Sequence, residues 1–306
     1  MGELMLIDAA GLYFRAFYAL PESITAPDGR PVNAIRGYLD MSAAMIERRR
    51  PRRFVSCLDL DWRPAFRVEL VPSYKAHRVA ADGGEEVPAA LAAQIPLLLR
   101  VLDSLGLASA GAEGFEADDV IATLATRDHA TVDVVTGDRD LLALATDRIT
   151  VCYTGKGIAK MEPMGAAEVL ARYGVPAVNY ADFAVLRGDP SDGLPGVAGV
   201  GEKTAAALVG RFGSVEAILA AADAGDDGFP AGAALKVLAA RDYLEAAPAA
   251  VRGRLDVPVE PFDDSLPAAP SDADELRELV GALGIGSSVS RIQSAIAVAL
   301  GDATGS

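Results

Sequence analysis

The sequence predicts an α/β domain with a mostly parallel central sheet, followed by an all-helical region. Short apolar runs such as "LMLID" (4–8) alternate with segments whose apolar residues recur at helical spacing, a pattern typical of doubly wound sheets. From about residue 164 only helical segments with short Gly/Pro turns remain. Three of the predicted strands end in an aspartate, at Asp8, Asp59 and Asp138. Because ligands of such sheets bind at the carboxyl ends of the strands, we expect these three side chains at one site.

The individual elements follow in chain order. Strands are expected at 4–8, 53–59 and about 131–138, and the segments 148–155 and 157–162 could pair as a hairpin. Helices are expected over 9–20, 32–50, 88–106 and 115–129, the third of them kinked or begun at a proline. We divide the chain into residues 1–165 (α/β core), 166–256 (helical region) and 257–306. In the last part a Pro/Asp-rich surface linker at 257–273 precedes two closing helices near 272–283 and 287–300.

The 306-residue chain has the composition of a globular protein, with 51% hydrophobic and 23% charged residues. Its net charge of -15 argues against nucleic acid as a partner, although basic residues cluster at 47–53 and 63–78. For "ERRRPRR" (47–53) a solvated helix end followed by a turn is the simpler interpretation. The apolar first twenty residues are interrupted by Glu3, Asp8 and Arg15, and no other run is long enough to span a membrane. We therefore expect a cytoplasmic protein without a membrane contact, and a monomer.

Sulfur and imidazole ligands are scarce, with two cysteines and two histidines. Cys57 and Cys152 lie in apolar strand-like runs and are expected to be buried, reduced thiols. This composition excludes a zinc site, so any metal must be a hard cation held by oxygen.

Nine carboxylates occupy strand ends, helix starts and turns. They are Asp8, Asp59, Glu116, Asp118, Asp119, Asp138, Asp140, Asp189 and Asp192. Taken singly, an acid at a helix start is explained as a cap, and one in a Gly/Pro turn is ordinary. Gathered together they would repel one another, and no nearby stretch offers enough Lys or Arg to offset them. Two or more Mg²⁺ or Mn²⁺ ions are the simpler solution, and such ions could clamp a phosphodiester for in-line attack.

The glycine-rich stretch "GDPSDGLPGVAGVGEKTA" (188–205) resembles a nucleotide-binding loop only superficially. Glu202 stands before Lys203, where a phosphate loop would need glycine, and no strand precedes the glycines as a dinucleotide fingerprint requires. The remaining interpretation is a helix–hairpin–helix, in which Gly199 and Gly201 let the backbone approach a phosphate and Lys203 supplies charge. An ordinary helical corner would explain the glycines, but not the two aspartates beside them.

Taken together, these motifs resemble the bacterial 5′-3′ exonuclease and flap endonuclease family, a relative of the N-terminal nuclease domain of DNA polymerase I. The resemblance covers about residues 4–255 and rests on "LIDAAG", "CLDLDWRPAFRVELVPSYKAHR", "FEADDVIATLA", "TGDRDLLAL" and "LRGDPSDGLPGVAGVGEKTA". It implies a PIN-like nuclease core, a helical arch at about 62–100 and a helix–hairpin–helix (H3TH) subdomain. It also implies a stand-alone, Mg²⁺- or Mn²⁺-dependent nuclease acting on 5′ flaps, ends, nicks or gaps of DNA in primer removal and repair.

The resemblance further implies roles for individual residues. Lys75 and Arg78 in "YKAHR" would contact the scissile phosphate from one face of a helix. Asp8, Asp59, Glu116 and Asp118 would surround a first metal, with Asp119 close by, and Asp138, Asp140, Asp189 and Asp192 a second. The implied DNA contacts are Arg67, Tyr74, Gly199, Gly201, Lys203 and Thr204. Backbone carbonyls of Val197 and Val200 would hold a monovalent cation such as K⁺.

Two departures from the family pattern stand out, His77 and Gly193, and we expect Gly193 to loosen its turn. The acidic, glycine-containing segment 79–90 predicts a mobile arch. Two alternatives to the nuclease stay open. A catalytically weak relative that only binds branched DNA is disfavoured by the complete acidic set. A PIN-like ribonuclease is disfavoured by the arch motif and the hairpin.

Overall fold

A six-stranded sheet lies at the centre of the molecule. The computed structural model describes residues 2–81 and 83–301, and its strands have the order β3-β2-β1-β4-β5-β6. Only β6 is antiparallel, and its pairing with β5 confirms the expected hairpin. The strands are β1 (Leu4–Asp8), β2 (Arg53–Cys57), β3 (Ala108–Ala110), β4 (Val132–Thr136), β5 (Ile149–Tyr153) and β6 (Glu162–Met164). The sequence does not predict β3, because its 3 small residues show neither the length nor the alternation of a strand.

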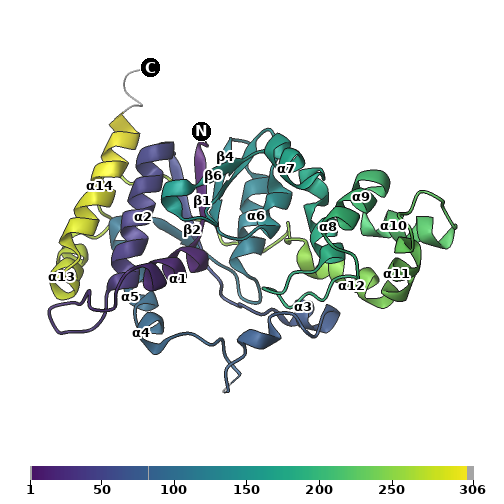
Figure 1. Ribbon diagram of the computed structural model, residues 1–306. Helices are drawn as coiled ribbons and strands as arrows, with labels where there is room; N and C mark the ends of the chain where they lie inside the picture. Colours follow the sequence, from purple (N-terminus) through teal and green to yellow (C-terminus); the bar gives the residue numbers. More distant parts are fainter. Residues whose placement is uncertain (1, 82, 302–306) are drawn as a thin grey trace.

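Helices cover both faces of this sheet, as predicted (Figure 1). Leu4 and Leu6 of β1 belong to one core, and Met5 and Ile7, which point the other way, belong to the second. The helices of this part are α1 (Ala9–Ala19), α2 (Asn33–Arg49), α4 (Ala89–Ala92), α5 (Ile95–Leu105) and α6 (Ala117–Arg127). The expected helix 88–106 is thus broken into α4 and α5 just before Pro96. Cys57 and Cys152 are buried free thiols, as expected.

The C-terminal helices return to the sheet domain and complete its second core. α13 (Ala273–Leu283) packs on α5, and α14 (Gly286–Gly301) packs along α2. The tract before them is tied to the start of β2: the Phe54 amide donates to the Asp264 carbonyl at 2.8 Å, and the Arg53 guanidinium donates to both Asp264 carboxylate oxygens at 2.8 and 2.7 Å. The predicted linker at 257–273 is therefore bound to the start of β2, and we call it the strap.

The basic run at 47–53 contains the end of α2, as expected, and two of its arginines also pair with acidic residues of the fold. Arg49 ends α2, and its guanidinium donates to both carboxylate oxygens of the buried Asp133 at 2.8 and 2.6 Å. Arg53 holds the strap described above. Glu47, Arg48 and Arg50 are exposed where α2 ends, so the predicted solvated helix end is present, but Arg49 and Arg53 are ion-pair partners within the fold.

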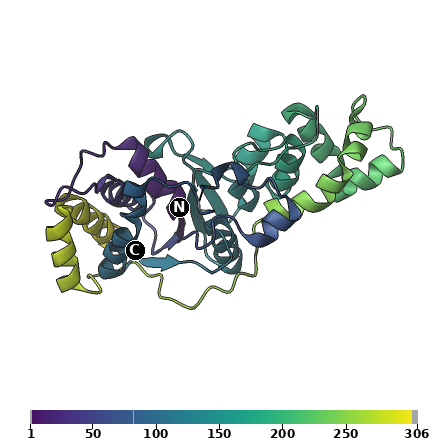
Figure 2. The ribbon, with the colours of Figure 1, turned by 90° about the horizontal axis from the view of Figure 1, so that it is seen from below.

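The region after residue 165 is all-helical, as predicted, and extends from one side of the sheet domain (Figures 1 and 2). Its helices are α7 (Ala166–Tyr173), α8 (Tyr180–Arg187), α9 (Glu202–Phe212), α10 (Val215–Asp223), α11 (Ala233–Ala239) and α12 (Arg241–Val251). The Ser214 side chain caps α10 by accepting from the Ala217 amide at 3.3 Å.

No single helix among the described residues has both the length and the apolar character needed to cross a membrane. By those two criteria alone, α9 and α10 would pass together as a pair bent by 82°.

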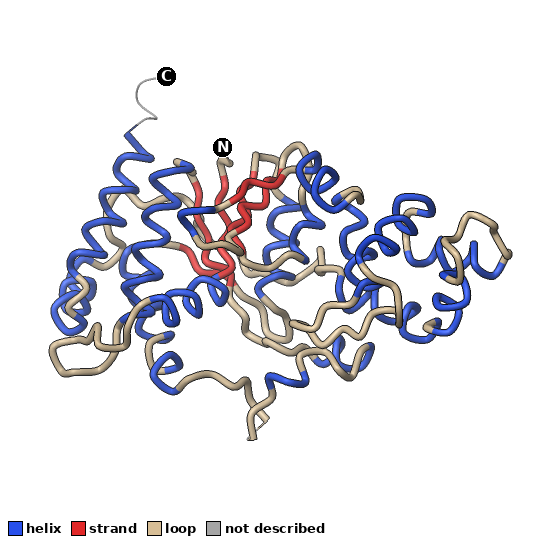
Figure 3. The backbone as a smooth tube through the Cα atoms, in the orientation of Figure 1, coloured by secondary structure: helices blue, strands red, loops and turns tan. Residues whose placement is uncertain are grey.

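About half of the described residues in the arch segment, about 62–100, lie in loops (Figure 3). Among residues 62–81 and 83–88, the only helical elements are α3 (Ala65–Leu70) and the 3-10 turn η1 (Ala76–Arg78). Lys75 precedes η1 with a left-handed φ of 47°. The expectation that Lys75 and Arg78 share one face of a helix is therefore wrong, because Lys75 is not helical.

Candidate active site

Asp8 ends β1 and also caps α1. Its Oδ1 accepts a hydrogen bond from the Gly11 amide at 2.8 Å, and its Oδ2 accepts one from the Thr136 hydroxyl at 3.0 Å. Thr136 ends the neighbouring strand β4, and its Oγ1 also accepts from the Asp138 amide at 2.9 Å. The adjacency of β1 and β4 thus joins two of the predicted aspartates. Desolvation raises the pKa of Asp8, and the charge of Asp138 raises it further against the effect of the hydrogen bonds.

Asp59 lies two residues beyond β2 and faces the start of α6. Its Oδ1 accepts from the amide of Ala117, the first residue of that helix, at 2.6 Å. A carboxylate suits a helix N-terminus, yet desolvation and the charge of Asp8 raise the pKa of Asp59. Because Asp8 and Asp59 are both desolvated and repel each other, the pair favours either a bound proton or a bound cation.

Glu116 and Asp119 begin α6 as a reciprocal capping box above Arg67 of α3. The Arg67 guanidinium donates to the Asp119 carboxylate twice at 2.7 Å and to Glu116 Oε2 at 2.5 Å. Its Nε donates to the Ala250 carbonyl at 2.7 Å, and Asp119 Oδ1 also accepts from the Arg254 amide at 2.9 Å. Arg67 is 3% exposed and Asp119 is 0% exposed.

These contacts revise two expectations. Arg67 is buried and paired with Glu116 and Asp119, so its position is that of an internal support at the border of the smaller pocket and not of the exposed DNA contact predicted. Asp119 has both oxygens occupied by protein donors and lines neither of the cavities described below. Its place beside the first metal is therefore that of a support for Glu116. The sequence does not predict these ion pairs, because Arg67 lies about fifty positions before Glu116 and Asp119.

Tyr74 and Lys75 hold Glu116 from the arch. The buried Tyr74 hydroxyl donates to Glu116 Oε2 at 2.9 Å, so this residue too is internal and not the DNA contact predicted. Lys75 Nζ donates to Glu116 Oε1. Burial opposes the charge on Lys75, but Glu116, Asp192 and Asp59 more than offset it and raise the pKa of the ammonium. Lys75 is therefore charged at neutral pH.

The loop that contains Asp189 and Asp192 joins the helical region to the arch. The Lys75 amide donates to the Asp192 carbonyl at 2.9 Å, and the Arg78 guanidinium donates to the Ser191 carbonyl at 2.7 Å. Desolvation raises the pKa of Asp192 to about 7, with Asp138 adding to the shift. These contacts place Arg78 and Lys75 beside the acidic group.

Asp189 is more fully paired than the sequence implies. Its Oδ2 accepts from Arg139 at 3.3 Å and from Arg187 at 3.2 Å, while Oδ1 accepts from the Ser191 amide at 3.0 Å and from its hydroxyl. Asp189 is 4% exposed. Of the four carboxylates predicted for the second metal, Asp189 thus has the most protein donors.

Gly193 tightens its turn instead of loosening it, contrary to expectation. Its φ is +71°, and a Cβ at this position would lie 2.1 Å from the Ser73 carbonyl oxygen of the arch. Glycine allows the two backbones to touch, which the Lys75–Asp192 hydrogen bond requires.

We expect Gly193→Ala to separate the loop from the arch and to lower the unfolding free energy by about 2–4 kcal/mol, combining left-handed strain with overpacking. Denaturant titration measures this. The matched control is Gly114→Ala, since Gly114 has a φ of +78° but open space around its Cβ position. Equal losses in the two variants would contradict the close-contact argument.

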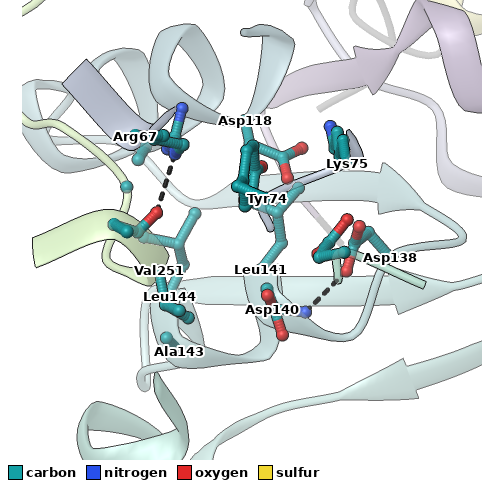
Figure 4. A pocket seen from close by; sticks show the side chains of 14 residues that line it. Arg67, Tyr74, Lys75, Asp118, Asp138, Asp140, Leu141, Ala143, Leu144 and Val251 are labelled. Atoms are coloured by element: carbon teal, nitrogen blue, oxygen red, sulfur yellow. Dashed lines mark hydrogen bonds between the residues drawn. The ribbon is translucent and has the colours of Figure 1, made fainter. Parts of the chain in front are cut away.

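Two adjoining cavities lie at this edge of the sheet. The larger, of about 470 Å³, is lined from the acidic set by Asp8, Asp59, Glu116, Asp118, Asp138 and Asp189. A smaller pocket of about 30 Å³ is lined by Asp118, Asp138, Asp140 and Asp192 (Figure 4). Asp118 and Asp138 border both cavities, as does Lys75, and Arg78 borders the larger one. Eight of the nine predicted carboxylates therefore meet here, all except Asp119.

The smaller pocket contains an unpaired buried oxygen. Asp140 donates its amide to Asp138 Oδ1 at 2.8 Å, but across residues 2–81 and 83–301 nothing donates to its own buried Oδ1. Desolvation and the charge of Asp138 raise the pKa values of Asp118 and Asp140 well above the usual range. Among the described residues, no group of three or more Asp, Glu, Cys or His side chains is already arranged to coordinate a metal ion. The site is an open acidic cavity with unsatisfied oxygen.

The predicted hairpin connects α8 to α9. Gly196 and Gly199 have φ of 68° and 71°, and Gly201 caps α9 without a side-chain hydrogen bond. Lys203 is exposed and Thr204 half-buried in the first turn of α9, so the amides of that turn and the Lys203 ammonium face solvent together. The Val197 and Val200 side chains are buried beneath the hairpin.

Comparison with known proteins assigns the chain to a family. A sequence model described as the 5′-3′ exonuclease N-terminal resolvase-like domain matches residues 3–174, and one described as the 5′-3′ exonuclease C-terminal SAM fold matches residues 175–274. The chain belongs to the 5′-3′ exonuclease family.

Two relatives and one solved structure show what this chain is similar to. A 5′-3′ exonuclease of Mycobacterium tuberculosis is 50% identical over 96% of this chain and 97% of its own length. DNA polymerase I of Mycobacterium bovis is 39% identical over 90% of this chain but 30% of its own length. The bacteriophage T5 D15 flap endonuclease, solved as a complex with DNA and metal ions, has a TM-score of 0.61 at 16% identity, covering 97% of this chain and 98% of its own. The last similarity concerns the fold alone.

In this 5′-3′ exonuclease the larger cavity also contains charged residues that sequence reasoning missed. Arg15, Arg139 and Glu85 line it alongside the acidic set. Two of them had a sequence signal. Arg15 lies one helical turn after Gly11, which the Asp8 cap places at the cavity, and Arg139 stands between the two aspartates of "TGDRDL".

Proposed function

We propose that this protein is a divalent-metal-dependent 5′ nuclease that hydrolyses DNA phosphodiesters at 5′ flaps, ends and nicks. The observation that carries the proposal is the meeting of eight carboxylates with the Lys75 and Arg78 cations around two adjoining cavities. The full-length similarity to a protein named a 5′-3′ exonuclease supports the reaction. A likeness of fold to a flap endonuclease solved with DNA supports the substrate. Primer removal and repair in the cytoplasm, by a monomer, form part of this proposal, and light scattering on purified protein checks the last point.

The donor set fits Mg²⁺ or Mn²⁺. All the candidate ligands are carboxylate oxygens, and the buried Oδ1 of Asp140 lacks a donor among the described residues. Desolvation, with mutual repulsion added to it, raises the pKa values of several of these carboxylates. Asp8, Asp59, Glu116 and Asp118 would hold one ion, and Asp138, Asp140 and Asp192 a second, with Asp189 at its edge. Such ions, when bound, supply a nucleophile at neutral pH and charge stabilisation for the phosphate.

The chain's own residues orient the substrate. Lys75 is charged and is held at the cavity by Glu116, so it can donate to a phosphate oxygen there. Arg78 is 35% exposed and is anchored on the Ser191 carbonyl, which leaves other guanidinium donors for the same phosphate. The hairpin residues Gly199, Gly201, Lys203 and Thr204 would grip the duplex through amides and charge, without reading bases.

Cleavage of a 5′-labelled flap in Mg²⁺ or Mn²⁺ tests the proposal. We expect Asp138→Asn to lower kcat/KM by roughly 10²–10³-fold, because Asp138 borders both cavities and its charge helps to hold the cations. The matched control is Asp147→Asn, an exposed position before β5 at the opposite end of the sheet, and it should cleave like the wild type. If wild type and Asp138→Asn are equally inert, the nuclease proposal is lost. An RNA flap cut faster than DNA would favour a ribonuclease.

A further inference from the structure

A lysine ammonium group from a neighbouring helix contacts the hairpin backbone. Lys236 of α11 extends its ammonium group to the Gly199 carbonyl oxygen, at 2.8 Å. A Cβ placed on Gly199 would lie 3.0 Å from Lys236 Nζ, so the ammonium rests directly over the hairpin backbone. α11 is anchored by the buried Ala233 and Val237, which fix the direction of this lysine.

The turn whose Val197 and Val200 carbonyls were implied to bind K⁺ therefore already has hydrogen-bond donors on its carbonyls. The Val197 carbonyl accepts from the Val200 amide at 2.9 Å, and the carbonyl of Gly199, the residue before Val200, accepts from Lys236. A monovalent cation bound at this turn would lie next to an ammonium of the same charge, and the Val197 carbonyl, one of the two implied for it, already accepts a hydrogen bond. The residues present do not fit a bound K⁺.

We infer that Lys236 takes the place of a monovalent cation at the hairpin, so that this protein grips duplex DNA without K⁺. The inference rests on the proposed function, since it concerns how the hairpin binds DNA. An ammonium group carries one positive charge on a compact centre with three donors. One donor engages Gly199, and the others remain for a DNA phosphate, which would thereby be linked to the hairpin through a covalently tethered cation.

Binding measured at constant ionic strength tests the inference. Fluorescence anisotropy of a labelled 5′-flap duplex, in EDTA to prevent cleavage, gives Kd in KCl, NaCl or tetramethylammonium chloride. The wild type should bind with the same Kd within about twofold in all three salts, since the counterion effect on phosphates depends on ionic strength. Lys236→Met should bind roughly tenfold more weakly in tetramethylammonium, because one charge-assisted contact is lost. KCl should restore part of that loss by filling the vacated position.

Two variants complete the test. Lys236→Arg keeps the charge and the donor, and should stay independent of the cation. Lys203→Met removes a hairpin charge that does not touch the Gly199 carbonyl, and should weaken binding equally in all salts. Because Lys236 is exposed, the melting temperature of Lys236→Met should match that of the wild type.

Two results overturn the inference while leaving the nuclease proposal intact. One is wild-type binding that is at least fivefold tighter in KCl than in tetramethylammonium, and the other is no K⁺ rescue of Lys236→Met. A wild-type protein that binds the flap duplex in none of the salts overturns the proposed function and this inference with it.

Discussion

Replacing Arg67 with alanine should lower the free energy of unfolding by about 3–5 kcal/mol, the range found when one partner of a buried ion pair is removed. Arg67 is 3% exposed, and its removal would leave Glu116 and Asp119 without their shared cation. The Ala250 carbonyl would lose its donor as well. Denaturant titration in EDTA measures the change without any contribution from bound metal.

The matched control for this prediction is Arg100→Ala. Arg100 also pairs with a carboxylate, that of Glu275 at 2.7 Å, but its side chain is 57% exposed. The expected cost is below about 1 kcal/mol, because exposed ion pairs contribute little. If both variants lose the same stability, burial is not what makes the Arg67 cluster important. A loss of stability in Arg67→Ala also predicts displacement of Glu116, so cleavage should fall together with stability.

Metal-free protein should become more stable as the pH falls from 8 to 5.5, and added Mg²⁺ should reverse this trend. The folded-state pKa of Asp192 is raised to about 7, and those of Asp8, Asp59, Glu116, Asp118 and Asp140 are raised as well. For an acid with a raised pKa, the folded state binds more protons than the unfolded state. Its stabilising contribution is therefore complete below the unfolded pKa and is lost as the pH rises through the folded pKa. Carboxylates with lowered pKa values, such as Glu216 at about 2, stay ionised throughout this window.

Divalent cations should compete with these protons. At pH 8 each ion present at a hundredfold excess over its Kd adds about 2.7 kcal/mol, so two ions would add about 5 kcal/mol. At pH 5.5 the gain should be smaller, because protons occupy the same oxygens. Melting curves at several pH values, with MgCl₂ or with EDTA, measure both trends.

A variant that neutralises one carboxylate of the site tests whether the site, and not the rest of the molecule, causes these effects. Asp192→Asn should stabilise the metal-free protein at pH 8 and reduce the gain from Mg²⁺, since it removes one repelling charge and one ligand together. Metal-free stability that rises steadily from pH 5.5 to 8, with no gain from Mg²⁺, would show that the acidic group is not a cation site.

The amino-acid sequence by itself determined the fold class and most of the site. Alternation along β1 sends Leu4 and Leu6 to one core and Met5 and Ile7 to the other, which local side-chain geometry dictates. Parallel strands ending in Asp8 and Asp138 had to meet at one sheet edge, and they do so through Thr136. The hairpin after α8 was readable because turn glycines and a helix start are local signals.

Only the tertiary structure decided how each charged side chain is used. Arg67 and Asp119 are paired across about fifty residues, and no local pattern records such a partner. The left-handed conformation of Lys75 and the need for Gly193 both arise where the arch meets the Asp189–Asp192 loop, a contact between segments more than a hundred residues apart. The return of α13 and α14 to the second core, and the hydrogen bond from Lys236 to Gly199, have the same origin. Spacing along the chain predicts which residues can meet at a sheet edge, but the fold alone sets which oxygen of a carboxylate remains free.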